Sequence, residues 1–254
     1  MITNIGVIAG KEIRTYFASP MAYVVAAAFL AITGFFFVAS VSDAFSEASI
    51  RGFLAGAVFF MIFMSPALTM RLIAEEQKLG TLELLFTSPL REAEVVLGKF
   101  FSAFFILLVM FALSLFFVLL LYIYGVPDSG PIASGYLGLI LYGAATLAVG
   151  IFASALSGNQ IVGLIVGAGI LTGMTVIDLV SDRVTGTAQE VLNGFQLGAS
   201  FSVFDLDSFG VAQGGHFADF ARGIISLGDI AYYLSLTGVF LILTVVVLEA
   251  RRLR

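Results

Sequence analysis

The sequence predicts an all-α integral membrane protein. It should have six transmembrane helices, an N-terminal amphipathic helix at the membrane interface, and a cytoplasmic segment with short helices between the second and third spans. Of its 254 residues, 60% are hydrophobic and only 11% are charged, with a mean hydropathy of +1.08, whereas soluble domains carry about 25% charged residues. The apolar residues form long blocks, and most basic residues lie in alternate connections between those blocks.

Six apolar stretches are long enough to cross a bilayer, whose hydrocarbon core of about 30 Å needs about 20 residues of helix. Helix is expected in each of them, because lipid offers no hydrogen-bonding partner to an unpaired backbone group. The stretches are residues 21–41, 53–73, 100–124, 133–155, 161–180 and 230–248.

The distribution of charge predicts which side each connection faces. Six spans place both termini on one side, and cytoplasmic loops are enriched in Lys and Arg. With cytoplasmic termini, nine of the twelve basic residues lie inside and the inner segments carry a net charge of +2. The outer side then carries ten acids, with Asp178 near the outer end of the fifth span included, against three bases, Arg51, Arg183 and Arg222. We therefore predict a multi-pass membrane protein with both termini in the cytoplasm.

The first 20 residues have the pattern of an amphipathic helix on the inner membrane surface. Apolar residues recur three to four positions apart between Ile2 and Phe17, and Lys11, Glu12 and Arg14 occupy the polar side. This spacing places the apolar side chains on one helix face. Ser19-Pro20 then marks a break, because proline disfavours helix in the residue before it.

The longest predicted outer connection is the segment 181–229. It is moderately apolar and rich in Gly and Phe, which favours a folded cap or short helices that dip back toward the membrane over a disordered loop.

Glycines in the fifth span are spaced for close helix packing. Gly163 and Gly167 form one small-x-x-x-small pair, and Gly169 and Gly173 form another. Such pairs let helix backbones approach one another in lipid, and they are common in polytopic proteins.

The cytoplasmic segment 74–98 between the second and third spans carries the most information. Its helical pattern breaks at Gly80 and again at Ser88-Pro89, with an apolar patch from Leu82 to Phe86 between the breaks. After Pro89 a new helix is expected to lead into the third span. Solvated loop charges are one interpretation of this segment. An exposed apolar patch rimmed by charges is better explained by a docking partner.

Several motifs of this segment resemble permease subunits of ABC-2-type exporters. They are Glu75-Glu76, Gly80-Thr81-Leu82-Glu83, Thr87-Ser88-Pro89-Leu90 and Leu97-Gly98-Lys99, together with Lys11-Glu12-Ile13-Arg14 and Ser19-Pro20 near the N-terminus. The compact size is most similar to the gliding-motility (Gld-type) permeases, and next to the permease linked to nitrous-oxide reductase maturation. The resemblance implies that residues 1–20 are a connecting helix and that the segment 74–98 contains the coupling helix, which contacts the ATP-binding subunit. The implied docking residues are Glu75, Glu76, Gly80, Thr81, Glu83, Thr87, Ser88, Pro89 and Arg91. The turn 157–160 resembles the family's second inner contact but lacks the basic residue found there in many members.

The chain is not expected to bind ATP or to be an enzyme. Its nearest approach to a phosphate loop, Gly6 to Glu12, has three residues between the glycines instead of four and Glu where Ser or Thr should bind Mg²⁺. ATP and Mg²⁺ are therefore expected on a separate cytosolic ATPase. The absence of Cys excludes thiolate chemistry and iron–sulfur ligation, and the single histidine, His216, excludes a multi-histidine metal centre. No catalytic residue, cofactor, metal or nucleic-acid partner is predicted.

Three hypotheses for function follow. In the first, the chain is the permease of an ABC exporter, with two ATPase copies and either a second permease copy or a Gld-type subunit with a large outer domain. In the second, it transmits the work of the ATPase to an outer-facing partner without moving a solute. A secondary carrier or channel is the third, and scarce intramembrane charge disfavours it, since Asp178 is the one acid within a predicted span. The sequence names no cargo, because fold does not fix substrate.

Overall fold

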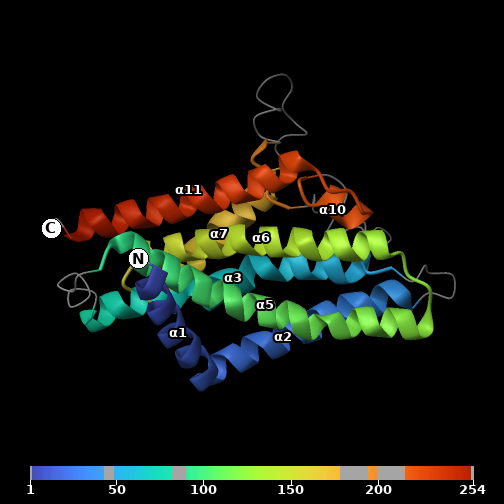
Figure 1. Cartoon of the computed structure of the whole chain (residues 1–254), viewed down its shortest axis with the longest axis horizontal. Coiled ribbons are helices and arrows are strands. Elements are labelled where there is room, and N and C mark those ends of the chain that lie inside the picture. Colours follow the sequence, from blue (N-terminus) through green and yellow to red (C-terminus); the bar gives the residue numbers. More distant parts are fainter. Residues whose placement is uncertain (1, 43–48, 82–89, 178–193, 199–214, 253–254) are drawn as a thin grey trace.

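The computed structural model describes residues 2–42, 49–81, 90–177, 194–198 and 215–252. Within these residues the secondary structure is helical, as predicted, and eight helices form one bundle (Figure 1). They are α1 (Ile2–Ala18), α2 (Pro20–Val41), α3 (Arg51–Leu79), α5 (Glu92–Tyr124), α6 (Ser129–Leu156), α7 (Gln160–Thr175), α10 (Ala218–Arg222) and α11 (Leu227–Arg252).

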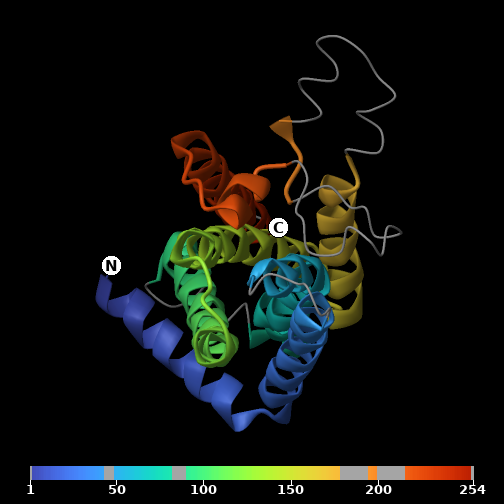
Figure 2. The same ribbon diagram turned by 90° about the vertical axis from the view of Figure 1, so that its right-hand side faces the viewer.

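The helices α3 and α6 form the centre of the bundle. They pack side by side. In an apolar stretch of 18 residues within each helix, 67% of the residues are buried in α3 and 72% in α6. The helices α2, α5, α7 and α11 surround them (Figure 2). Small residues permit this contact: the hydroxyl of Ser65 in α3 lies 2.8 Å from that of Thr146 in α6. Pro66 interrupts the hydrogen-bonding ladder of α3 at the same level.

Five helices are long and apolar enough to cross a membrane, namely α2, α3, α5, α6 and α11. Each covers one predicted span and extends beyond it at one or both ends. The predicted fifth span, 161–180, is represented by α7, which has 16 residues and therefore a rise of about 24 Å. That is less than the roughly 30 Å of a hydrocarbon core, and residues 178–180, with Asp178, lie outside the described residues. The count of six spans stays a prediction.

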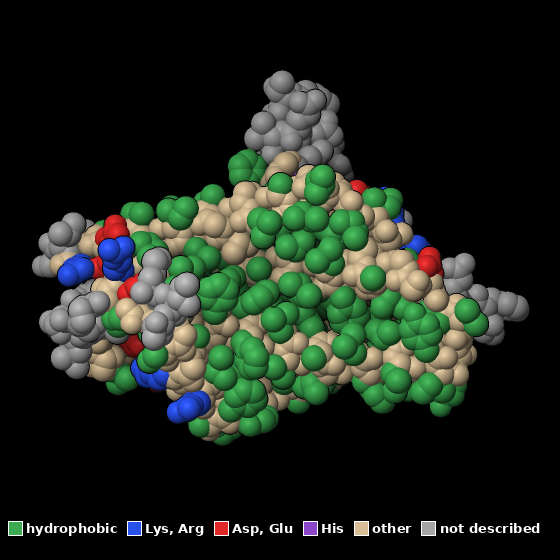
Figure 3. Space-filling model, in the orientation of Figure 1, with side chains coloured by type: hydrophobic (Ala, Val, Ile, Leu, Met, Phe, Trp, Pro, Cys, Tyr) green, Lys and Arg blue, Asp and Glu red, His purple; other side chains and the backbone are tan. Residues whose placement is uncertain are grey.

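The two ends of the bundle differ in their charge. The end that holds α1, the last turns of α3 and α11 and the first turn of α5 is called the termini end here, and it carries most of the charged side chains (Figure 3). Between this end and the opposite end, the visible surface is mainly apolar (Figure 3). An apolar belt between polar ends is the surface expected of a protein that spans a bilayer.

The opposite end is built from aromatic side chains and the short helix α10. Tyr142, Phe217, Phe220 and Tyr233 are buried and in contact with one another. An ideal Cβ on Gly138 would lie 2.7 Å from the Cβ of Phe220, so glycine is needed for α10 to lie on α6. This part of the predicted outer segment 181–229 is therefore folded. Its residues 181–193 and 199–214 lie outside the described residues.

Candidate docking site

The described residues of the predicted docking site lie at two helix ends. Glu75 and Glu76 occupy the last turns of α3, Gly80 and Thr81 follow that helix, and Arg91 precedes α5. The other predicted docking residues, Glu83, Thr87, Ser88 and Pro89, lie outside the described residues. We refer to residues 80–91 as the docking segment, and to the last two turns of α3 and the first two turns of α5 as its flanks.

The first predicted break coincides with the end of α3, whereas the second, Ser88-Pro89, lies outside the described residues. Gly80 caps α3 in the left-handed conformation, with φ of 71°, and its N–H donates to the carbonyl of Gln77 at 3.3 Å. Among the described residues, no atom beyond its neighbours in the chain lies within 4 Å of its ideal Cβ, and the left-handed backbone conformation by itself favours glycine here. After Pro89, α5 begins at Glu92 and continues without interruption to Tyr124.

The first turn of α5 is fixed by the carboxylate of Glu94. This carboxylate accepts the backbone N–H of Arg91 at 3.2 Å, which satisfies one of the free donors of the helix start. The same oxygen accepts a hydrogen bond from the amide of Asn4 in α1 at 3.2 Å. One buried carboxylate thus caps α5 and joins it to the start of α1.

Lys99 joins three helices next to the flanks. Its ammonium group lies 2.8 Å from a carboxylate oxygen of Glu76 in α3 and 3.0 Å from one of Glu12 in α1. The lysine side chain is only 2% exposed, and those of Glu12 and Glu76 are 13% and 18% exposed. Glu12, Glu76 and Lys99 are named the Lys99 cluster below. The cluster connects both flanks of the docking segment to α1.

Close packing of backbone atoms brings α1 onto α5 beside this cluster. An ideal Cβ on Gly98 would lie 2.7 Å from a methyl carbon of Ile8, so any side chain at position 98 would push α1 away. The predicted helix over the N-terminal residues is thus observed as α1, and its polar residue Glu12 is largely buried against α3 and α5. Lys11 and Arg14 are exposed. The predicted position of α1 along the membrane surface stays a prediction.

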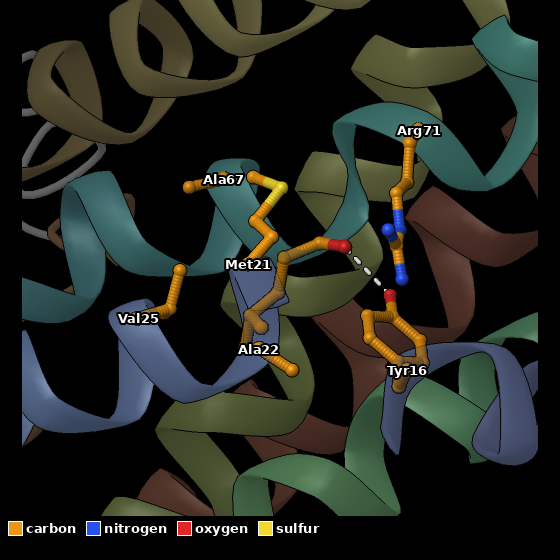
Figure 4. Close-up of a pocket in the computed structure, with 7 residues that line it drawn as sticks. Tyr16, Met21, Ala22, Val25, Ala67 and Arg71 are labelled. Atoms are coloured by element: carbon orange, nitrogen blue, oxygen red, sulfur yellow. Dashed lines mark hydrogen bonds between the residues drawn. The ribbon is translucent and has the colours of Figure 1, made fainter. Parts of the chain in front are cut away.

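The C-terminal end of α1 is held by Tyr16 (Figure 4). Its buried hydroxyl donates to the carbonyl of Leu68 in α3 at 2.6 Å, and the guanidinium carbon of Arg71 lies 4.8 Å from the centre of its ring. Arg71 also donates to the hydroxyl of Ser19 at 3.0 Å. Burial raises the pKa of the Tyr16 phenol far above its usual range, so the phenol remains a neutral donor.

The turn between α6 and α7 reaches the same end of the bundle. Gln77 in α3 donates to the carbonyl of Ala155, and Arg251 in α11 donates to the carbonyl of Leu156 at 2.9 Å and to Gln77 at 3.1 Å. Asn159 caps α7 by accepting the N–H of Ile161 at 2.9 Å, and Gly158 and Asn159 are exposed. The turn 157–160, predicted as a second inner contact, therefore lies next to the α3 flank.

The glycine pairs of α7 have different surroundings. The ideal Cβ of Gly163 lies 3.3 Å from Ser154 of α6, and that of Gly167 lies 3.1 Å from Pro66 of α3. Gly169 and Gly173 have no other described atom within 4 Å of theirs. The first pair packs within the chain. For the second pair, close helix packing stays a prediction that would need a partner outside the described residues.

Two residues of this site were not singled out by sequence reasoning. Lys99 belongs to the Leu97-Gly98-Lys99 motif and to the predicted inner basic residues. Its place between two carboxylates, however, depends on how α1 crosses α5. Ser154 accepts the N–H groups of Ile73 and Ala74 at 3.2 and 3.1 Å and donates to the carbonyl of Met70 at 2.9 Å. Such an insertion beside a helix can bend it, and a serine within an apolar span gives no sequence signal for this contact.

The sequence of the chain matches a known family. The model of the ABC-2 family transporter protein matches residues 38–246. The chain belongs to the ABC-2 transporter family. It is therefore a membrane protein and a permease subunit of an ABC transporter, a class in which a separate subunit hydrolyses ATP. No curated protein matches the chain. Among the residues that the structure describes, no three His, Cys, Asp or Glu side chains lie together as a metal site would require.

Proposed function

We propose that this permease is an exporter subunit driven by a separate cytosolic ABC ATPase, which docks on the docking segment and its flanks. The observation that carries the proposal is the fixed geometry of the flanks. Lys99 of α5 pairs with Glu76 of the α3 flank at 2.8 Å and with Glu12 of α1 at 3.0 Å, and α3 and α5 lead from the flanks into the bundle. A displacement of the docking segment would therefore be transmitted to the two long apolar helices α3 and α5.

The charge distribution supports a cytoplasmic position for the termini end. Of the basic residues in the described part of the chain, all except Arg51 and Arg222 lie at this end. Cytoplasmic loops are enriched in such residues. We infer that both termini face the cytoplasm, and that in a prokaryotic cell the protein lies in the inner membrane.

Exposed groups at the termini end fit a protein partner. Glu75, Lys78 and Arg91 are exposed, and Leu79 is 67% exposed beside Gly80. Charged side chains around an exposed apolar one are typical of a docking surface. The partner would supply the ATP and Mg²⁺ sites, and two copies of it would serve a pair of membrane subunits. The second membrane subunit is either another copy of this chain or a Gld-type subunit.

Co-purification tests this function. The affinity-tagged chain is isolated from its native membrane in mild detergent, and an ABC ATPase is sought by its sequence among the co-purified proteins. We expect Glu83→Lys to reduce ATPase recovery and permease-dependent stimulation of ATP hydrolysis by about tenfold, because charge reversal at a desolvated contact costs more than about 1.4 kcal/mol. The matched control is Glu249→Lys, an exposed acid of α11 at the same end. Unchanged assembly and stimulation with Glu83→Lys would refute the proposed docking surface.

The second candidate function is a motor component that acts on an outer-facing partner without transporting a solute. It is supported by the folded state of α10, where Arg51 donates to the carbonyl of Ala221 at 3.3 Å and Ser134 to that of Phe220 at 2.7 Å. A rigid platform at this end could hold a partner. Replacing residues 199–214 by a short linker should then abolish recovery of the outer partner and leave ATPase docking intact. Retention of both would refute the motor hypothesis.

A further inference from the structure

We propose that the Lys99 cluster is a positioning element that makes α1 move with the docking segment during the ATPase cycle. This inference rests on the proposed function and assigns a role to Glu12, Glu76 and Lys99 in coupling, separate from ATPase binding. Family membership does not supply it, because α1 lies outside the matched residues 38–246.

Burial and distance show that the cluster is a firm link. Lys99 is 2% exposed, and its ammonium group lies within 3.0 Å of two carboxylates from two other helices. A buried charge that loses its partner is strongly disfavoured. The three groups therefore stay together unless another charged group replaces one of them, and a displacement of either flank is transmitted to Glu12.

The remaining contacts of α1 connect it to one neighbouring helix at a time. Asn4 and Ile8 contact α5, through Glu94 and Gly98, whereas Tyr16 contacts α3 through Leu68. Among the described residues, the Lys99 cluster is the place where ion pairs join α1, α3 and α5 at a single side chain. Loss of this junction would leave α1 attached at both ends but without a shared link to the two flanks.

The composition of the cluster allows each of its two ion pairs to be removed separately. Two carboxylates share one ammonium group, and Oε2 of Glu76 is buried without a hydrogen-bonding partner in the described part of the chain. Removal of either acid leaves one balanced ion pair in place. Glu12→Ala therefore removes the ion pair to α1 and keeps the Lys99–Glu76 pair, and Glu76→Ala removes the ion pair to α3 and keeps the Lys99–Glu12 pair.

The experiment measures motion of α1 in the complex with the co-purified ATPase. The chain has no cysteine, so spin labels can be attached at introduced cysteines alone. Thr15→Cys with Ala250→Cys reports the distance from α1 to α11, and Lys78→Cys with Ala250→Cys reports the distance from α3 to α11. All three positions are exposed. Because Lys78 belongs to the proposed docking surface, ATPase co-purification is measured with the unlabelled chain, and each labelled variant is compared with the same labelled pair in the wild-type cluster. Distances are compared without nucleotide and with ATP plus orthovanadate.

When the Lys99 cluster is wild type, we expect both distances to differ between the nucleotide-free state and the state with ATP plus orthovanadate. With Glu12→Ala, ATPase co-purification and the shift of the 78–250 distance should persist. The shift of the 15–250 distance should be lost, and permease-dependent stimulation of ATP hydrolysis should fall about fivefold or more, the usual scale of coupling between sites. The double variant Glu12→Lys with Lys99→Glu restores two acids and one base, and should restore the 15–250 shift. Arg252→Gln, which removes a pair between α11 and α5 with no part in the cluster, should behave as wild type in both distances.

Three outcomes would overturn the inference. The first is a 15–250 shift in Glu12→Ala equal to that of the wild type. The second is loss of ATPase recovery together with the shift, which would make the cluster a structural part of the docking surface. The third outcome concerns the double variant Glu12→Lys with Lys99→Glu, which is decisive if Glu12→Ala reduces the yield of folded protein. The inference is overturned if this double variant folds and binds the ATPase but shows no shift of the 15–250 distance. If the wild-type chain recovers no ATPase, the proposed function fails and this inference fails with it.

Discussion

The two ends of the bundle are held together by different kinds of contact. At the termini end, side chains from α1, α3, α5 and α11 and a backbone carbonyl of α6 meet through ion pairs and charged hydrogen bonds around Lys99 and Arg251. At the opposite end, aromatic rings from α6, α10 and α11 pack around Tyr142 and Tyr233, and hydroxyl groups donate to backbone carbonyls. Two hydrogen bonds there involve ionisable side chains, from Arg51 to the carbonyl of Ala221 and between His216 and Asp229.

Because of this difference, exposed contacts at the termini end can rearrange more easily than the packed rings at the opposite end. The exposed ion pairs of the termini end depend on solvent and on partners that can be exchanged, whereas close-packed rings and the buried Lys99 cluster have few alternative arrangements of similar energy. An ATPase that docks at the termini end would therefore act on contacts that can be rearranged, while the aromatic end keeps the helices in register.

Lys99→Met should lower the free energy of unfolding by about 3 kcal/mol, because it leaves two carboxylates of the Lys99 cluster close together without their cation. The measurement is an SDS titration in mixed micelles, followed by circular dichroism. Adding Glu12→Gln and Glu76→Gln should recover most of the loss, since the triple variant buries no unpaired charge. Lys78→Met, at an exposed position of the same end, is the control. A triple variant no more stable than Lys99→Met would contradict the electrostatic explanation.

Gly138→Leu should destabilise the opposite end by about 2 kcal/mol through overpacking. The new side chain would meet Phe220 and Phe217, whose atoms lie 2.7 and 3.1 Å from the ideal Cβ. Gly169→Leu is the matched control in another helix, because no described atom lies within 4 Å of its ideal Cβ. The same SDS titration measures both. Equal losses for the two variants would mean that close contact with α10 does not determine the effect.

Tyr233→Phe should cost about 1 kcal/mol, the usual net worth of one hydrogen bond. The hydroxyl of Tyr233 donates to the carbonyl of Leu197 at 2.8 Å, and the ring is fully buried. Removal of the oxygen alone keeps the aromatic packing. The matched control is Tyr23→Phe, whose hydroxyl bonds to Phe17 at an exposed site. If Tyr233→Phe lowered the free energy of unfolding more than Gly138→Leu does, hydrogen bonding would contribute more than packing to the stability of this end, contrary to our expectation.

Much of the fold could be predicted because the bilayer imposes simple length and composition rules. The helices α2, α3, α5, α6 and α11 follow from apolar blocks longer than about 20 residues, and the break at Gly80 follows from its conformational freedom. The α7 helix ends at Thr175, five residues before the predicted end of that span. Hydropathy continues through Val176 and Ile177, but apolar character alone does not determine where a helix ends.

The candidate site was only partly predictable, because its contacts join distant parts of the chain. The pattern located the flanks through Glu75, Glu76 and Arg91, but it gave no reason to connect Glu12 with Lys99, which is 87 residues away. That connection depends on the angle at which α1 crosses α5, which in turn depends on Ile8 packing against Gly98. Sequence periodicity predicts which face of a helix is apolar, not which helix covers it.

The smallest effect is expected at an exposed ion pair of the termini end. Arg252 lies 2.6 Å from Glu92, but its side chain is 50% exposed, and exposed pairs contribute about 0–1 kcal/mol. Arg252→Gln should therefore change the free energy of unfolding by less than about 1 kcal/mol, and 1 M salt should reduce that difference further, because the Debye length falls to about 3 Å. The loss caused by Lys99→Met should persist in the same salt, since Lys99 is 2% exposed. If salt erased both differences alike, the Lys99 cluster would be open to solvent, and the firm link between α1 and the flanks would be lost as an explanation. Persistence of the Lys99 effect alone would show that the termini end contains one solvent-protected junction surrounded by weaker, exchangeable contacts.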